Sequence, residues 1–175
     1  LLFAGWLTRD VLKRDTGTAA MQEVSNAIKV GAEAFVKRQY TTIAIMSVLM
    51  SIIIFIAYAY FAKNTSLGWR TAVSFIFGAA SSALAGIVGM WISVRSNIRT
   101  ASAARRSMND AFVTAFRGGA VTGIVIVAMS LLGVSVIYYL FSIGIDVKEV
   151  PFLIVGYGFG ASFVALFAQL GGGIY

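Results

Sequence analysis

Four long stretches of the chain carry no charged side chain. They span residues 41–62, 71–94, 118–145 and 150–175. A bilayer core about 30 Å thick needs roughly 20 helical residues to cross it, and each stretch reaches that length. The pattern predicts four transmembrane helices, with residues 1–7 as the end of an earlier one. The predicted fold class is an all-α polytopic membrane protein, built as a transmembrane helix bundle.

A different pattern occupies residues 18–38. Apolar residues recur there at alternating spacings of three and four, and polar and charged residues lie between them; the apolar set is Met21, Val24, Ile28, Gly31 and Phe35. This spacing is typical of an amphipathic helix. The helix could lie on the membrane surface or pack beneath the protein. Its polar face mixes both charge signs, which favours packing.

Composition and charge place the protein in lipid and give its orientation. Of 175 residues, 59% are hydrophobic and 12% charged, whereas soluble domains are about half apolar and a quarter charged. Eleven of the 14 Lys and Arg lie in residues 8–40 and 95–117, and three lie in the other connectors. Basic residues collect in cytoplasmic loops, so residues 8–40 and 95–117 are predicted to be cytoplasmic. The net charge of +7 is thereby explained without a nucleic-acid partner.

Several kinds of chemistry are excluded by the residues present. The chain has no His and no Cys, which removes disulfides, common zinc sites and thiol or imidazole catalysis. All seven carboxylates lie outside the four uncharged stretches, so none marks an ion path at mid-membrane depth. The sequence Gly-Tyr-Gly-Phe-Gly-Ala at residues 156–161 matches a dinucleotide fingerprint, but it lies inside an apolar stretch with no acidic residue after it. The residues alone therefore reveal no catalytic set.

Small residues repeat along three of the predicted spans. Such spacing lets helix backbones approach closely in lipid, and the residues concerned are Gly78, Ser82, Gly86, Gly89, Gly118, Gly119, Gly123, Gly156 and Gly160. We expect them to form packing seams of a compact bundle. The final glycines, Gly171, Gly172 and Gly173, are poor helix formers and suit a helix end close to a neighbour or a ligand.

Three arginines after the second uncharged stretch, Arg99, Arg105 and Arg106, allow two interpretations. They could attract an anionic ligand, or they could only set the topology, which we favour. Asp110 lies four residues after Arg106 and would form a helix-surface ion pair with it if one helix ran through both.

Several segments resemble the membrane-integral pyrophosphatases, which pump protons or sodium ions. The resemblance covers nearly the whole chain in the right order, through "MQEVSNAIKVGAEAFVKRQYTTIA" (21–44), "GAASSALAGIVGMWISVRSNIRTASAAR" (78–105), "AFRGGAVTG" (115–123) and "GASFVALFAQLGGGIY" (160–175). It implies a homodimer with about sixteen helices per subunit, arranged in an inner and an outer ring. On this mapping the chain holds the end of the first helix and the next four.

The resemblance also implies a function for the intact protein. It would hydrolyse Mg²⁺-pyrophosphate at the cytoplasmic face and pump H⁺ or Na⁺ outward, in the plasma membrane of a prokaryote. The catalytic and metal-binding residues are expected after Tyr175, so this chain, which begins with Leu and looks like a fragment, would be inactive alone. Gly171, Gly172 and Gly173 would form the edge of the active site. The potassium requirement and the choice of ion stay open.

One position departs from the family pattern. Gln169 stands where the family commonly has Arg, and an amide cannot supply a fixed positive charge. Gln169 is either part of a variant ion pathway or an amide satisfied by neighbouring helices. Two other classes of function also stay open, namely a fragment of a secondary transporter or channel, and a non-catalytic membrane scaffold subunit.

Overall fold

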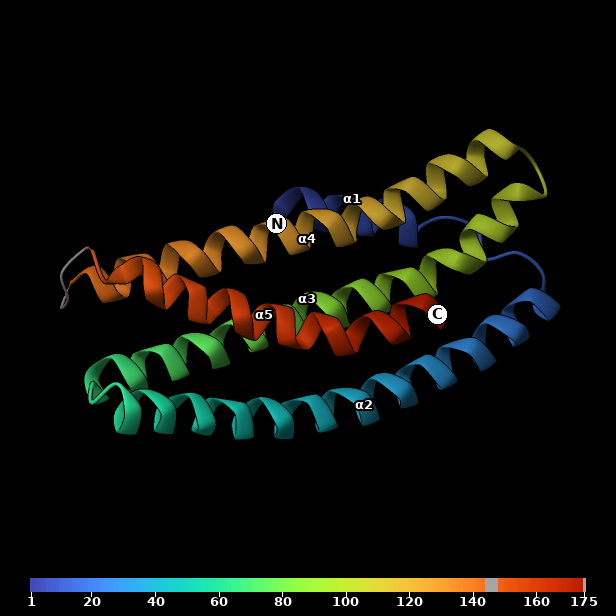
Figure 1. The fold of residues 1–175 in the computed structure, drawn as a ribbon. Coiled ribbons are helices and arrows are strands. Elements are labelled where there is room, and N and C mark those ends of the chain that lie inside the picture. Colours follow the sequence, from blue (N-terminus) through green and yellow to red (C-terminus); the bar gives the residue numbers. More distant parts are fainter. Residues whose placement is uncertain (144–147, 175) are drawn as a thin grey trace. The chain divides into compact units, whose positions relative to one another are not determined.

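The computed structural model describes residues 1–143 and 148–174, with side chains up to residue 169. Every regular element in these residues is helical, as Figure 1 shows. In chain order they are α1 (Leu2–Leu12), α2 (Ala19–Ile56), the π-helical turn η1 (Ala57–Phe61), α3 (Thr65–Ala104), α4 (Met108–Ser142) and α5 (Val150–Ile174). Four segments are long and apolar enough to cross a membrane: Ala19–Phe61, Thr65–Ala104, Met108–Ser142 and Val150–Gln169. The predicted all-α fold with four spans is confirmed.

The segment from residue 13 to residue 18 separates α1 from α2. Gly17 has a φ of +74°, a conformation that residues with a side chain rarely adopt. Thr18 then accepts a hydrogen bond from the Met21 amide at 3.4 Å, a helix N-cap. From Ala19 the helix runs without a break to Ile56 and passes into η1, so the predicted helices 18–38 and 41–62 are joined in one continuous helix. Since no Gly or Pro lies between them, nothing in residues 38–41 stops the helix.

Helix α3 begins with a side-chain cap. The Leu67 amide donates to the Asn64 side-chain oxygen at 2.9 Å, directly after Lys63, which adopts a φ of +51°. The helix then continues for 40 residues, beyond residue 94, where the uncharged stretch ends. At 1.5 Å per residue it is about 60 Å long, roughly twice the hydrocarbon thickness of a bilayer. Much of the predicted connector 95–117 is therefore helical.

The connection between α3 and α4 is only three residues long, from Arg105 to Ser107. The expected ion pair between Arg106 and Asp110 required one helix through both residues. The connection interrupts the helix between them, so this expectation is corrected. Arg106 instead lies 3.7 Å from Asp15, and the Ser107 hydroxyl accepts from the Asp110 amide at the start of α4. Helix α4 ends at Ser142. The predicted end of this span, residue 145, lies outside the described residues.

Helix α5 starts with Pro151 in its first turn, where a missing N–H costs no hydrogen bond. It continues as helix through Gly171, Gly172 and Gly173 to Ile174. The helix thus ends directly after the glycine run, within the predicted span 150–175, because glycine only weakens a helix that its neighbours continue. The surroundings of these glycines, and Tyr175, lie outside the described residues.

The chain forms two compact units, which we describe separately. The first unit holds residues 1–38, 85–128 and 170–175, and the second holds residues 39–84 and 129–169. In the second unit, Ile137, Leu153 and Tyr157 form one buried cluster, and Ile43, Ala79 and Val164 form another. Helix α5 thus packs in this unit against parts of α2, α3 and α4 (Figure 1).

The glycine seams are confirmed where α5 meets α3. A Cβ atom at Gly78 would overlap the backbone carbonyl of Tyr157, and one at Gly160 would overlap the carbonyl of Phe75. Only glycine permits so close an approach of the two backbones. In the first unit, Gly118 lies tightly against Ser96, but Gly119 has no described atom near its Cβ position. On α4, close packing is therefore seen at Gly118 but not at Gly119, although the sequence predicted it at both.

Candidate functional site

A network of charged side chains joins three helix ends in the first unit. We call it the polar junction; it comprises Asp10, Arg14, Asp15, Arg99, Ser102, Arg106, Thr114 and Arg117. These residues come from the end of α1, the segment that follows it, the last turns of α3 and the first turns of α4. The junction brings together residues more than 80 positions apart in the sequence.

Asp10 is the centre of one half of the polar junction. Its carboxylate accepts a hydrogen bond from Arg117 at 2.7 Å and one from Arg14 at 3.3 Å. The hydrogen bond from Arg117 is the largest reason that the pKa of Asp10 lies below its ordinary value. Arg14 also donates to the buried Thr114 hydroxyl at 2.7 Å, which ties α1 to α4. Asp10 is therefore held as a carboxylate by two guanidinium groups.

Asp15 is the centre of the other half. The Ser102 hydroxyl donates to its carboxylate, and Arg106 lies 3.7 Å from the same oxygen. The hydrogen bond from Ser102, followed by that from the Gly17 amide, lowers the pKa of Asp15. Arg99 donates to the Leu12 carbonyl at 3.0 Å. Of the three arginines that were candidates for ligand attraction, Arg99 and Arg106 are thus bound to the end of α1 and the segment after it.

The sequence alone does not predict this junction. The spacing of Asp10 and Arg14 is a visible i, i+4 signal, but Arg117 lies 107 positions away from Asp10. In residues 1–143 and 148–169 no three acidic, His or Cys side chains come together as a metal site could require. The carboxylates of Asp10, Asp15 and Glu33 each lie within 4 Å of an arginine. The described residues therefore do not fit a Mg²⁺ site. The hydrogen bonds and ion pairs of the polar junction instead hold the ends of α1, α3 and α4 together.

Gln169 is the last residue whose side chain the structure describes, and it is exposed. Two residues earlier on α5, the Phe167 carbonyl accepts a hydrogen bond from the Gln39 side-chain amide at 3.4 Å. This bond ties α2 to α5 close to Gln169 without involving the Gln169 side chain. The other predicted site residues, Gly171, Gly172 and Gly173, follow on the same helix, and their surroundings lie outside the described residues.

The second unit also contains an apolar pocket of about 610 Å³ between α2, α3 and α5. Aromatic rings dominate its lining, including Tyr58, Phe75, Phe159 and Phe163, and Thr71 and Ser162 are the polar contributors. Every lining residue is uncharged. A pocket of this composition suits aliphatic or aromatic groups and cannot neutralise a multiply charged anion such as pyrophosphate.

Comparison with known proteins assigns the chain to a family. The sequence profile described as "Inorganic H+ pyrophosphatase" matches residues 1–175. The chain belongs to this family. A relative from Moorella thermoacetica, named "K(+)-insensitive pyrophosphate-energized proton pump 2", is 48% identical over 175 residues. A relative from Methanosarcina mazei, named "K(+)-insensitive pyrophosphate-energized proton pump", is 46% identical over the same length.

A plant protein of the family is similar as well. "Pyrophosphate-energized membrane proton pump 3" of Arabidopsis thaliana is 43% identical over 190 aligned residues, which include 97% of this chain. The alignments cover 24%, 24% and 23% of the Moorella, Methanosarcina and Arabidopsis relatives. The chain thus spans about a quarter of the length of these pyrophosphatase-family proteins.

Proposed function

We propose that this chain is the amino-terminal membrane portion of a pyrophosphate-energized proton pump. The observation that carries the proposal is the match of the family profile to all 175 residues, together with relatives named as proton pumps at 43–48% identity. The intact protein would hydrolyse pyrophosphate at the cytoplasmic face and export H⁺. Since the printed names of two of these relatives include "K(+)-insensitive", we extend potassium independence to this protein.

The role we assign to this chain within the pump is structural. The polar junction would clamp α1, α3 and α4 on the cytoplasmic side, where the basic connectors lie. The close contacts at Gly78 and Gly160 would hold α5 in a fixed register against α3. The Mg²⁺ ligands and the residues that act on pyrophosphate would come from the remaining part of the protein. We also propose that the intact protein is a homodimer.

Two groups in this chain are proposed to border the functional centre. Gln169 would belong to the ion pathway, because it is an uncharged polar residue near the end of an otherwise apolar helix. Gly171, Gly172 and Gly173 would form the edge of the active site, where the lack of side chains leaves the helix backbone open to close approach.

The test uses the full-length protein in sealed membrane vesicles. Pyrophosphate should release phosphate and acidify the vesicle interior, both processes should require Mg²⁺, and neither should change when K⁺ is omitted. A proton ionophore should abolish the gradient but not hydrolysis. Residues 1–175 expressed alone should do neither. Absence of pyrophosphate hydrolysis, or a gradient made of Na⁺ only, would overturn the proposal.

A further inference from the structure

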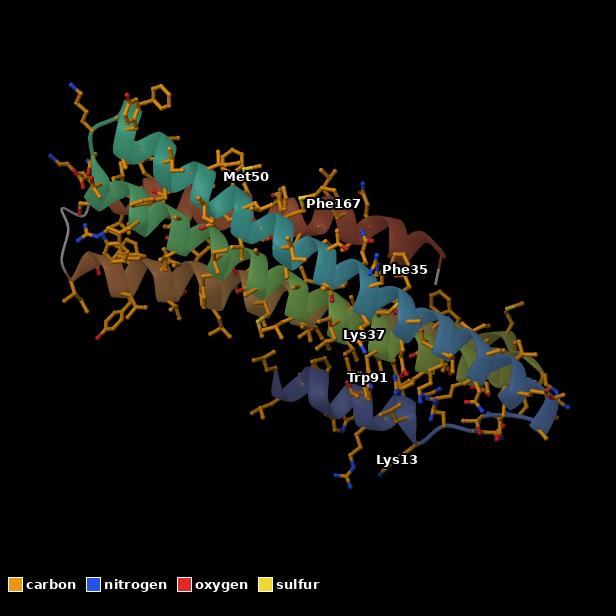
Figure 2. All side chains as sticks on the ribbon, turned by 90° about the horizontal axis from the view of Figure 1, so that it is seen from below. Lys13, Phe35, Lys37, Met50, Trp91 and Phe167 are labelled. Carbon is orange, nitrogen blue, oxygen red and sulfur yellow. The ribbon has the colours of Figure 1, made fainter. Side chains whose placement is uncertain are left out.

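A second, smaller pocket lies in the first unit between α2 and α3. Its volume is about 180 Å³, and it is separate from the polar junction. We call it the basic pocket; its lining comprises Lys29, Glu33, Lys37, Trp91 and Arg95 with the apolar residues Ala32, Val36, Ile87, Met90 and Val94. In Figure 2, labels mark Lys37 of α2 and Trp91 of α3, which line this pocket, and Lys13, which follows α1 and does not line it.

The charge of the basic pocket favours an anion. Three cationic side chains and one carboxylate line it. Glu33 lies 3.9 Å from Lys29 and 3.7 Å from Arg95, so both cations share one carboxylate at distances longer than a direct hydrogen bond. Arg95 also donates one N–H group to the Trp91 carbonyl at 3.0 Å, and a guanidinium has five such donors. Both cations therefore keep donor capacity for a ligand.

The pocket combines charged and apolar side chains in its lining. The Arg95 guanidinium lies over the Trp91 ring, 4.3 Å from its centre, and this cation–π contact holds it beside the ring. Ile87 and Trp91 are both 41% exposed beside it, while Val94 is buried below. Small-molecule pockets typically measure about 300–1,000 Å³, so this pocket suits one phosphate group rather than a whole soluble metabolite.

The sequence places the basic pocket at the membrane boundary. Lys37 lies just before the uncharged stretch 41–62, and Arg95 lies just after the stretch 71–94. Tryptophan and basic residues gather at this depth, where the rings meet the headgroups and the long basic side chains reach the water. Basic pockets between transmembrane helices on the cytoplasmic side are typical binding places for anionic lipid headgroups.

We propose that the basic pocket binds an anionic glycerophospholipid. Lys29 and Arg95 hold the headgroup phosphate, Trp91 covers the glycerol region, and an acyl chain lies along Ile87 and Met90. Glu33 sets the affinity by opposing the anion. This proposal does not depend on pyrophosphate hydrolysis, so it can fail while the proposed function holds.

The experiment measures lipid binding to the purified full-length protein by native mass spectrometry. Phosphatidylglycerol and phosphatidylcholine with the same acyl chains are compared. Each basic group near an anionic lipid surface contributes about 1 kcal/mol, which is about fivefold in affinity. We expect the double variant Lys29→Gln/Arg95→Gln to lose phosphatidylglycerol binding roughly 30-fold. The matched control Arg9→Gln/Lys13→Gln removes the same charge from the end of α1 and the residue after it, and should bind as the parent protein does.

A variant that is expected to strengthen lipid binding tests the proposal even if the double variant fails to fold. Glu33→Gln removes the opposing carboxylate and should tighten phosphatidylglycerol binding by about fivefold, with phosphatidylcholine binding unchanged. Inorganic phosphate should not displace the lipid, because it lacks the acyl chain. Equal losses in the pocket and control variants, no change in Glu33→Gln, or displacement by phosphate alone would each overturn the proposal.

Discussion

At the scale of single residues, two glycines on α5 have opposite surroundings. A Cβ atom at Gly160 would overlap the Phe75 carbonyl of α3, whereas one at Gly158 would meet no described atom within 4 Å. We expect Gly160→Ala to destabilise the protein by about 1–3 kcal/mol, the usual cost of overpacking. Gly158→Ala should be neutral or slightly stabilising, because alanine is the better helix former. Thermal unfolding of the detergent-solubilised full-length protein measures both, and equal effects would contradict the tight seam.

The ion pair between Asp10 and Arg117 gives a second prediction at this scale. The pKa of Asp10 is lowered in the folded protein, so its contribution to stability is present above the ordinary pKa of about 3.9 and disappears as the pH falls through the lowered value. Asp10→Asn should cost about 1 kcal/mol at neutral pH, since both side chains are partly exposed. The difference from the parent protein should vanish in strong acid.

The control for the Asp10 prediction is Glu23→Gln. Glu23 has no ion-pair partner among the described residues, so this change should leave thermal unfolding unaffected at every pH. A double-mutant cycle with Arg117→Gln separates the pair from other effects. If Asp10→Asn and Arg117→Gln add independently, the two residues do not stabilise the fold through each other.

The sequence predicted the role of a residue only where its contact partner lay nearby in the sequence or where its residue type was unusual for an apolar stretch. The glycines at positions 78 and 160 were found because small residues repeat along apolar stretches, and that repetition has one common cause in membranes. The partners of Asp10 and Asp15 were not found, since they lie 107 and 87 positions away and depend on how α1 meets α3 and α4. The basic pocket was missed for the same reason.

At the scale of helices, the continuity of α2 is the clearest difference from the expectation. If residues 18–38 and 41–62 were separate helices, a proline at Thr41 would lie in a first turn and be tolerated. In the continuous helix Thr41→Pro removes a hydrogen bond and clashes with the preceding turn, at a cost of about 3 kcal/mol or more. We expect this variant to lose most of its folded yield. Ala19→Pro, at the true start of α2, should keep it.

Helix ends were harder to predict than helix positions. Uncharged stretches mark the part of a helix that lies in lipid, and each of the four overlaps one of the long described helices. Charged residues do not end a helix, however, and residues 95–104 continue α3 because they contain neither Gly nor Pro. The length of each helix within the lipid could thus be predicted from the sequence. The length of each connector could not, because it depends on capping contacts such as that of Asn64.

At the scale of the whole molecule, the orientation in the membrane can be tested with single cysteines. The chain contains no cysteine, so only those elsewhere in the full-length protein need to be replaced first. The positive-inside rule predicts that Ser66→Cys, at the start of α3, faces outward and that Ala104→Cys, at its end, faces the cytoplasm. A membrane-impermeant thiol reagent should label only Ser66→Cys in intact cells, and Ala104→Cys after permeabilisation. The reverse pattern would invert the topology.

The proposed ion pathway leads to the last prediction for the intact pump. Gln169 lies near the end of the uncharged α5, and Gln169→Arg would introduce a fixed charge that an amide cannot provide. If Gln169 borders the ion pathway, this charge changes the electrostatics of the pathway, and pyrophosphate-driven acidification should change more than phosphate release does. Gln22→Arg adds the same charge outside the uncharged stretches and should change neither rate. Equal changes in transport and hydrolysis, or none, would remove Gln169 from the pathway and leave it a packing residue.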